Sequence, residues 1–284
     1  MTREILQAGG LRLDFDPELG GAILGLSRDG EALLRPTPEG ATDVLETACF
    51  PLVPYANRIG NGRFTFAGRT AALSRNMAGQ AHPLHGDGWR AAWRVEARGD
   101  DSAALVFEPA ATEWPWRYRA RQTFRVAPDS LTVELAVTNL DTEPGPFGLG
   151  LHPYFPHSAA ARLTADTRGL WLASDDLLPA EHVAVSPWIA GAPLRSTRLL
   201  DHCHTGWGGE ARLDLGPGRP SLTLTASPEL GWLHLFAPPD QDFFCVEPVS
   251  HAPDAVNMVD PVANGIRVLA PGETLATWTR LDFM

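Results

Sequence analysis

Two long stretches of alternating polar and apolar residues give the clearest structural signal in the sequence. They cover residues 116–126 and 131–140, and the segment between them reads Ala-Pro-Asp-Ser. Successive side chains of a β-strand point to opposite faces of a sheet, so each stretch predicts a strand with one apolar and one polar face. With turn-forming residues between them, they predict an antiparallel hairpin whose sheet has one solvated side.

Shorter apolar or alternating runs predict the remaining strands, because Gly and Pro separate them as turn formers. These runs are residues 11–15, 21–26, 49–53, 64–66, 72–73, 93–97, 103–107, 222–226, 232–236, 243–246, 266–269 and 274–283. No window combines a 3.6-residue apolar period with caps at both ends, so helices should be few and short. We therefore predict an all-β fold, with residues 1–284 forming one large antiparallel domain.

Length and composition fit this prediction and exclude several kinds of partner. A chain of 284 residues can bury a core that needs neither disulfide nor metal. The 27 Gly and 25 Pro residues are scattered between apolar runs, as turns are. A net charge of −11 argues against a nucleic-acid or anionic membrane partner and fits a small neutral ligand.

Cysteine usage and the N-terminal residues indicate a cellular location. The three cysteines, Cys49, Cys203 and Cys245, form no CxxC pair, which favours a reducing compartment over a disulfide framework. No pattern assigns them a role. The N-terminus lacks the apolar segment of a signal peptide, and no run of 18 apolar residues occurs. We expect a soluble cytoplasmic protein.

A carboxylate inside an apolar run is the first candidate for chemistry. Glu247 follows Phe-Phe-Cys-Val, and Pro248 comes next. Because Pro cannot donate to a ladder, we expect the strand to end or to lie at an edge there. A Glu in such a run is costly to bury unless it is paired, hydrogen-bonded or required for a reaction. A salt bridge to an Arg at the strand end is the structural alternative.

Three other polar clusters accompany apolar runs. The first places Asn57 and Arg58 before two glycines, which fits either a cleft or a surface turn. The second, HPLHGDGW from His82, contains His85 and Trp89 and predicts a loop that a ligand approaches closely. Its two His residues also allow a metal site, but no zinc signature accompanies them.

The third cluster places His152 at the end of an apolar, Gly-rich strand, before Pro and two aromatic residues. Such a His is commonly a satisfied core residue, yet His is also the usual acid or base near neutral pH. A further segment, LDHCHTGWGG, is expected to be a loop that offers the carboxylate of Asp201 and the ring of Trp207.

Five segments resemble, in order, motifs of the aldose 1-epimerase (galactose mutarotase) family. They are NRIGNGRFTFAGRTAAL from Asn57, HPLHGDGW from His82, GLGLHPYF from Gly148, LDHCHTGWGG from Leu200 and VEPVSHAPDAVN from Val246. The C-terminal VLAPGETLATWTRLDF is similar to the family's closing strand. The resemblance implies a large antiparallel β-sandwich, galactose mutarotase-like, with a sugar cleft on one sheet.

The resemblance also implies roles for particular residues. It makes Glu247 the general base and His152 the general acid, and it gives sugar contacts to Asn57, Arg58, His85 and Asp201. Trp89 or Trp207 would supply an apolar face for the sugar ring. Because the reaction transfers only protons, we expect no cofactor and no metal, a small-molecule sugar as ligand, and a monomer or homodimer.

The expected reaction interconverts the α and β anomers of a hexose by opening and closing the ring. It requires an ionised Glu247 and a protonated His152, so a carboxylate such as Glu247 or Asp201 should raise the pKa of His152. This sequence departs from the galactose enzymes at VPYANRI, HGDGW and VEPVSHAPDA, and in having His204 at a position that is usually aromatic. These departures alter the pocket and leave the acid and base in place.

Three other functions remain open at this point. A hexose-6-phosphate 1-epimerase would need a basic phosphate pocket, for which Arg58, Arg63 and Arg90 are candidates. A glycosidase would pair Glu247 with a second carboxylate, either Asp201 or Asp254. A non-catalytic sugar-binding or regulatory module would use the same pocket without accelerating a reaction.

Overall fold

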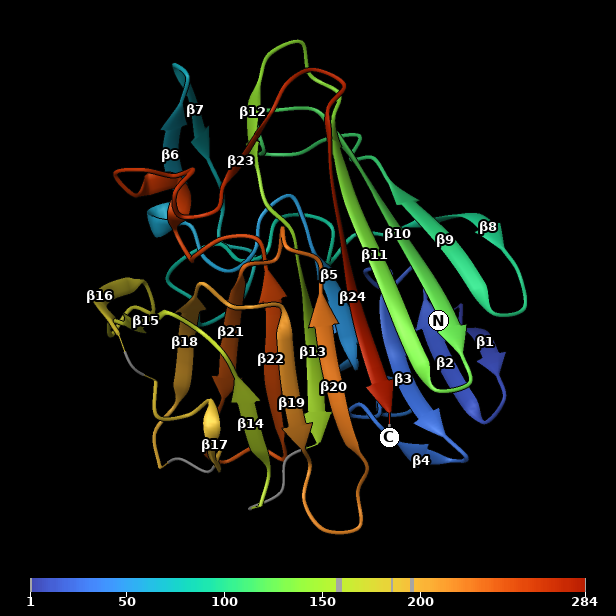
Figure 1. Ribbon diagram of the computed structural model, residues 1–284. Helices are drawn as coiled ribbons and strands as arrows, with labels where there is room; N and C mark the ends of the chain where they lie inside the picture. The colour runs from blue at the N-terminus through green and yellow to red at the C-terminus, as the bar shows by residue number, and fades with distance from the viewer. Residues whose placement is uncertain (1, 157–159, 185, 195–196, 284) are drawn as a thin grey trace.

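The alternating stretches of the sequence become strands of two large sheets in a computed structural model, which describes residues 2–156, 160–184, 186–194 and 197–283. In these residues the first sheet has eleven strands. Its order is β1 (Glu4–Ala8), β2 (Leu11–Asp16), β3 (Ala22–Arg28), β5 (Cys49–Leu52), β13 (Gly150–Pro156), β22 (Phe243–Val249), β21 (Trp232–Ala237), β18 (Leu200–Thr205), β15 (Gly169–Ala173) and β16 (Pro179–Val183), with β4 (Glu31–Ala32) beside β3 (Figure 1).

The second sheet has nine strands among the described residues, all paired antiparallel. Its order is β17 (Ala190–Pro193), β14 (Arg162–Ala165), β19 (Glu210–Asp214), β20 (Ser221–Ala226), β24 (Thr274–Phe283), β11 (Ser130–Asn139), β10 (Tyr118–Ala127), β9 (Ser102–Phe107) and β8 (Arg94–Arg98). The predicted long hairpin is β10–β11, which pairs from Tyr118↔Asn139 to Ala127↔Ser130. This prediction is confirmed.

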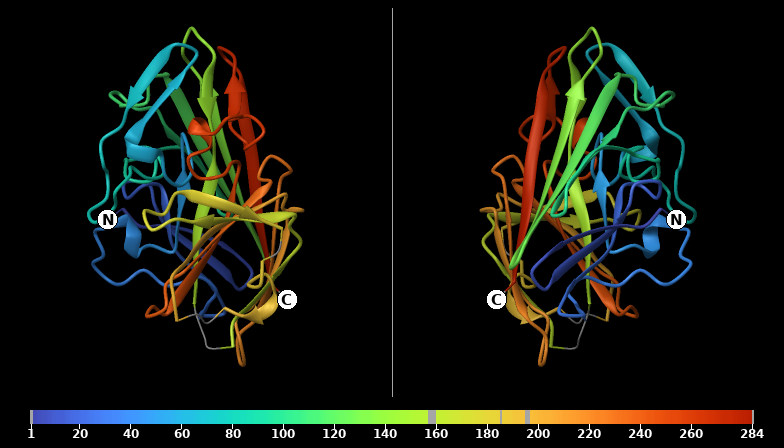
Figure 2. Two further views of the ribbon diagram at one scale, coloured as in Figure 1. Left: turned by 90° about the vertical axis from the view of Figure 1, so that its left-hand side faces the viewer. Right: turned by 90° about the vertical axis from the view of Figure 1, so that its right-hand side faces the viewer.

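Two small sheets and three short helices complete the described part of the chain. They are β6 (Arg63–Phe66) with β7 (Arg69–Ala72), β12 (Gly145–Phe147) with β23 (Arg267–Leu269), and the 3₁₀ helices η1 (Val44–Glu46), η2 (Gly60–Gly62) and η3 (Ala255–Asn257). In the side views, the β6–β7 hairpin and β12 lie at the same end of the molecule (Figure 2). The predicted all-β class with few short helices is confirmed. No helix in the described ranges is long and apolar enough to cross a membrane.

The main hydrophobic core lies between the two large sheets. Phe15 of β2 meets Phe124 of β10 with ring centroids 5.1 Å apart. Phe155 of β13 stacks on Phe244 of β22 within the same core. Removing this much apolar surface from water supplies most of the free energy that favours the folded state.

The period of two along β22 turns its polar residue to the other face of the first sheet. Phe244 and Val246 belong to the core between the sheets, whereas Cys245 and Val249 belong to a second apolar cluster on the opposite face. Glu247 shares the parity of that second pair, so its carboxylate points away from the main core. The outer face of the eleven-stranded sheet is therefore where polar chemistry can be placed.

Several sequence-based expectations about elements were wrong. The strand at 243 does not end at Pro248 but runs to Val249, and it lies in the interior of the sheet between β13 and β21. Residues 200–205, expected to form a loop, are strand β18, and His152 lies inside β13 rather than at its end. These strands were not predicted correctly because they contain polar residues. A local sequence pattern does not show that other segments bury those residues.

A gap in the β13–β22 ladder explains why strand β22 can contain Pro248. The β13–β22 ladder pairs Gly150 with Val249 and Tyr154 with Cys245, and no pairing is formed between these points. Pro153 and Pro248 both fall in this gap, where no N–H is required. The same register brings His152 and Glu247 opposite each other where the ladder is open.

Candidate active site

The outer face of the eleven-stranded sheet carries a cavity of about 90 Å³. This size suits part of one small ligand rather than the 300–1,000 Å³ typical of drug-sized sites. Its lining combines a cluster of polar side chains with apolar ones: Leu45, Asn57, Arg58, Met77, Gln80, Leu84, His85, His152, Tyr154, Asp201, His234, Phe236 and Glu247. Six of the eight residues predicted from the sequence are thus brought together.

His152 and Glu247 face each other in this cavity. The His152 Nε2 atom lies 3.4 Å from Glu247 Oε1, and both side chains are more than nine-tenths buried. Phe50 and Tyr154 stack on the imidazole, with ring centroids 4.6 and 4.7 Å from it. His152 Nδ1 and Glu247 Oε2 have no hydrogen-bond partner among the described residues. Buried polar atoms are rarely left so, which makes this pair a candidate for binding a ligand.

A buried ion-pair network lies beside this pair. Asp201 accepts from His234 Nε2 at 2.6 Å and lies 3.1 Å from Arg58 Nη2. Burial alone would raise the pKa of Asp201, but these two cations hold it well below its usual value. Burial alone would lower the pKa of His234, but the hydrogen bond to Asp201 raises it to about 10. Near neutral pH the network therefore consists of a carboxylate and two cations.

The expected raised pKa of His152 is contradicted. Burial, together with the charge of His234, lowers the pKa of His152 to about 3. Burial also raises the pKa of Glu247 to about 8, although His234 opposes this. The carboxylate of Asp201 raises the pKa of His152, but burial and the charge of His234 outweigh this effect. Near pH 7 the dominant state of the pair is thus a neutral imidazole and a carboxylic acid.

Asn57 and His85 lock two loops together at the edge of the cavity. The Asn57 amide donates to His85 Nδ1 at 3.1 Å, and the His85 amide donates to the Asn57 carbonyl at 2.9 Å. Both have positive φ, 58° and 61°, which is uncommon outside Gly and recurs at functional sites. Because Nδ1 accepts and burial lowers the pKa of His85, its Nε2–H is the atom left to donate to a ligand.

Residues behind the cavity lining hold these loops in place. Some of them were candidates for catalysis or metal binding in the sequence analysis. His251 Nε2 accepts from the Ala56 amide at 3.0 Å. Asp254 accepts from the Gly60 amide at 2.8 Å and does not line the cavity, so a glycosidase pair with Glu247 has no support there. His82 Nδ1 accepts from the Asn61 amide while His85 faces Asn57, so these two His rings do not converge on a metal.

Neither of the two predicted tryptophans lines the cavity. Trp89 is fully buried, donates to the Gly86 carbonyl and packs beside His85 and Phe50. Trp207 is buried in the main core and donates to the Glu210 carbonyl. The sequence could not distinguish an aromatic residue that supports a loop from one that faces a ligand. The apolar lining near the polar cluster comes instead from Tyr154 and Phe236.

Sequence reasoning missed His234 although the signal was present. Residues 232–236, Trp-Leu-His-Leu-Phe, were predicted to be a strand, and a His inside that run poses the same burial problem as Glu247. Gln80, whose side-chain oxygen accepts from Arg58 Nη2 at 3.2 Å, had no comparable signal. It reaches the cavity from a loop, and only tertiary structure places that loop.

One group of side chains in the described residues could hold a metal ion. His152, Cys245 and Glu247 each offer a ligand atom, and these atoms lie within 4.8 Å of one another. Two of the three are the facing acid–base pair itself, and burial holds the Cys245 thiol pKa well above its ordinary value. We assign no metal to this group.

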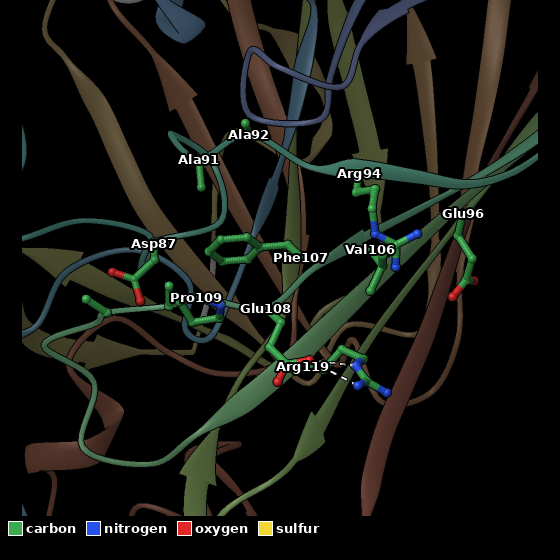
Figure 3. A pocket seen from close by; sticks show the side chains of 12 residues that line it. Asp87, Ala91, Ala92, Arg94, Glu96, Val106, Phe107, Glu108, Pro109 and Arg119 are labelled. Atoms are coloured by element: carbon green, nitrogen blue, oxygen red, sulfur yellow. Dashed lines mark hydrogen bonds and ion pairs between the residues drawn. The ribbon is translucent and has the colours of Figure 1, made fainter.

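A larger hollow of about 690 Å³ lies on the second sheet, over β8, β9 and β10 (Figure 3). Its walls carry Arg119 paired with Glu108 at 3.0 Å, besides Arg94, Glu96, Phe107 and Asp87. None of the predicted site residues lines it, and it lacks a buried acid–base pair. The smaller cavity therefore remains the candidate active site.

Comparison with known proteins identifies the family to which this fold and site belong. The aldose 1-epimerase family model matches residues 6–282. The chain is 37% identical over 285 residues to the uncharacterized protein YphB of Escherichia coli K12, covering 96% of each. We conclude that the chain belongs to the aldose 1-epimerase family, as the resemblance predicted.

Solved structures agree with this assignment. A crystal structure of an Escherichia coli K12 protein proposed to be an aldose 1-epimerase has a TM-score of 0.92 and 36% identity, covering 100% of this chain and 99% of that one. A galactose mutarotase-like protein from Clostridium acetobutylicum has a TM-score of 0.86, 18% identity, and coverage of 99% and 94%. The second likeness concerns the fold alone. The family is one of isomerases that act on sugars.

Proposed function

We propose that this protein is an aldose 1-epimerase that interconverts the α and β anomers of a free hexose, with Glu247 as general base and His152 as general acid. The observation that carries the proposal is their facing arrangement at 3.4 Å in a cavity lined by hydrogen-bonding side chains. Anomerisation needs one group to remove the C1 hydroxyl proton and another to protonate the ring oxygen. Acid–base catalysis of this kind contributes about 10²–10⁴-fold.

The protonation state of the pair supplies the single proton that this reaction needs. Between pKa values of about 3 for His152 and about 8 for Glu247, the two groups share one proton. Its transfer from Glu247 to His152 gives the carboxylate base and imidazolium acid. Ring closure reverses the two roles, so the pair returns to its starting state after each turnover.

The remaining polar groups of the cavity would hold the sugar. Arg58 donates from a guanidinium fixed by Asp201 and Gln80, and His85 offers its Nε2–H. Such preorganised donors can stabilise the negative charge that develops on an oxygen in the transition state. Tyr154 and Phe236 provide apolar surface for the ring carbons.

A neutral sugar fits the charges of the cavity better than a sugar phosphate does. Arg58 is the one Arg or Lys among the described lining residues, and its guanidinium is already held by Asp201 at 3.1 Å. Arg63 and Arg90 do not line the cavity. Phosphate recognition commonly uses uncompensated cations in bidentate contact. A hexose-6-phosphate 1-epimerase is therefore our second candidate.

The test is the decay of optical rotation of freshly dissolved α-glucose and α-galactose, with wild type, Glu247→Gln and His152→Asn. We expect acceleration by wild type and a loss of at least about 10²-fold in either variant. A hexose 6-phosphate panel, followed by its own anomer-specific assay, addresses the second candidate. If wild type accelerates none of these sugars while still binding them, a sugar-binding module becomes the better description.

A further inference from the structure

His234 is a buried histidine at the centre of the site to which the proposed reaction gives no role. It lies in the middle of β21, is 3% exposed, and is the cross-strand partner of Glu247 on β22. On its other side, Cys203 of β18 is its partner, and Asp201 lies two residues before Cys203. Side chains of cross-strand partners share a face, with Cβ atoms about 4.5–5.5 Å apart. His234 is therefore set between the carboxylates of Asp201 and Glu247.

Asp201 fixes both the orientation and the charge of the His234 ring. Its Oδ1 atom accepts from His234 Nε2 at 2.6 Å, and both side chains are 4% exposed. A short bond to a carboxylate favours the imidazolium form, as in charge-assisted pairs generally. Asp201 is held in turn by Arg58, so the ring is clamped from a loop as well as from a neighbouring strand.

The charge on His234 acts on a neighbourhood that is crowded with ionisable groups. These are Asp201, His202, Cys203 and His204 on β18, Cys245 and Glu247 on β22, His152 and Tyr154 on β13, Cys49 on β5, and Arg35, Arg58 and His85 in loops. Within this set, His234 is the strongest influence that favours the ionised form of Glu247, ahead of Arg58. Asp201 acts in the opposite direction on Glu247.

We propose that His234 is a positioning residue of the active site: its imidazolium, clamped by Asp201, stabilises the carboxylate of Glu247 and thereby sets the pH range in which Glu247 acts as base. This inference rests on the proposed function for its catalytic consequence. Its electrostatic content, the coupling of His234 to Glu247, holds independently of any substrate.

The expected size of the coupling follows from the separation of the two side chains. An opposite charge within about 4–6 Å of a carboxyl group typically moves its pKa by 1–3 units. Replacing His234 with neutral Gln should move the titration midpoint of Glu247 upward by at least about one unit. At pH 7 the ionised fraction of Glu247 should then fall by about tenfold or more.

The direct test follows the Glu247 carboxyl carbon by ¹³C NMR in the full-length protein, assigned by its loss in Glu247→Gln. We expect the midpoint in His234→Gln to lie above the wild-type midpoint, and the pH profile of kcat/KM to move with it. His202→Gln is the matched control, because His202 is a half-buried imidazole of the same sheet that stacks on Trp188 away from the cavity. In that control both midpoints should stay at their wild-type values.

A double variant separates an electrostatic role from a purely structural one. In His234→Gln the carboxylate of Asp201 loses its imidazolium partner and opposes ionisation of Glu247 more strongly. Adding Asp201→Asn should therefore bring the Glu247 midpoint back down toward the wild-type value. If His234 only maintained the fold, the second substitution would add damage, and a midpoint that stays high or rises further would overturn the proposal.

The NMR and kinetic results fail in distinguishable ways. An unchanged Glu247 midpoint in a folded His234→Gln protein refutes the coupling, whatever the activity is. If wild type accelerates no aldose, the proposed function fails, and the midpoints still decide whether His234 controls Glu247. Folding of each variant is checked by near-UV circular dichroism, and His234→Asn replaces His234→Gln if that variant does not fold.

Discussion

Replacing Glu247 with Gln should make the protein more stable while removing its activity. Glu247 is 1% exposed, and its Oε2 atom has no hydrogen-bond partner among the described residues. Burial raises its pKa from 4.5 to about 8. The folded state thus disfavours the ionised side chain, and this is the cost of keeping a base in a closed cavity.

The sign and size of the effect follow from proton linkage. Between pH 4.5 and about 8 the folded protein holds a proton on Glu247 that the unfolded chain has lost, so its contribution to stability falls as pH rises. At ~1.4 kcal/mol per pKa unit, burial of Glu247 costs about 5 kcal/mol at pH 8 and little near pH 4.5. A Gln amide left partly unsatisfied costs about 1–3 kcal/mol. The net gain of Glu247→Gln should be about 2–4 kcal/mol at pH 8.

Differential scanning calorimetry at pH 5 and pH 8 measures this directly. For a chain of this length, 2–4 kcal/mol corresponds to a rise in Tm of roughly 4–10 °C. Glu210→Gln is the control, because Glu210 is about half exposed in an ion pair with Arg212 and should change Tm little at either pH. A Tm gain for Glu247→Gln that is no larger at pH 8 than at pH 5 would refute the reasoning.

Other perturbations test separate parts of the site. Asp201→Asn should lower the free energy of unfolding by about 3–5 kcal/mol. Because the pKa of His234 is raised to about 10, this loss should be full below pH 6.5 and should fade as pH rises through 10. Urea denaturation at pH 6 and pH 10 measures it. Gly86→Ala should lower kcat/KM by up to ~10²-fold, as measured by steady-state kinetics. Gly86 has a φ of +72°, and a Cβ there would lie 2.3 Å from the Val53 carbonyl oxygen, so the substitution should displace His85. Trp207→Phe should leave KM unchanged, whereas loss of the hydrogen bond to the Glu210 carbonyl should lower the free energy of unfolding by about 1 kcal/mol. A changed KM would indicate that Trp207 contacts the sugar. For wild type, kcat/KM should fall as pH rises through about 8, because ionisation of Glu247 removes the single proton that the pair shares; steady-state kinetics between pH 5 and 9.5 measures it.

Local pattern in the sequence was sufficient for the fold class and for much of the strand layout. The alternation in β10 and β11 survives in the structure as alternating burial, because each strand has one face on the core and one in solvent. Strands such as β18 escaped prediction for the opposite reason. Asp201 and His204 within it are buried by other segments, and no local pattern records which polar residues will be covered.

The sequence by itself also determined which residue types could carry proton transfer. A Glu and a His in otherwise apolar strands stand out because burying them is costly unless something in the site requires them. The order of the five motifs was enough to indicate the family. Neither signal needs knowledge of which segments meet in space.

Only the tertiary structure decided how these residues act on one another. The register of β13, β22 and β21 sets Glu247 between His152 and His234, and the β18–β21 pairing adds Asp201. This arrangement gives His234 rather than His152 the positive charge, because the short bond to Asp201 outweighs burial for one ring and no such bond exists for the other. The proton affinity of a buried group is a property of its surroundings, and here those surroundings come from strands that lie far apart in the sequence.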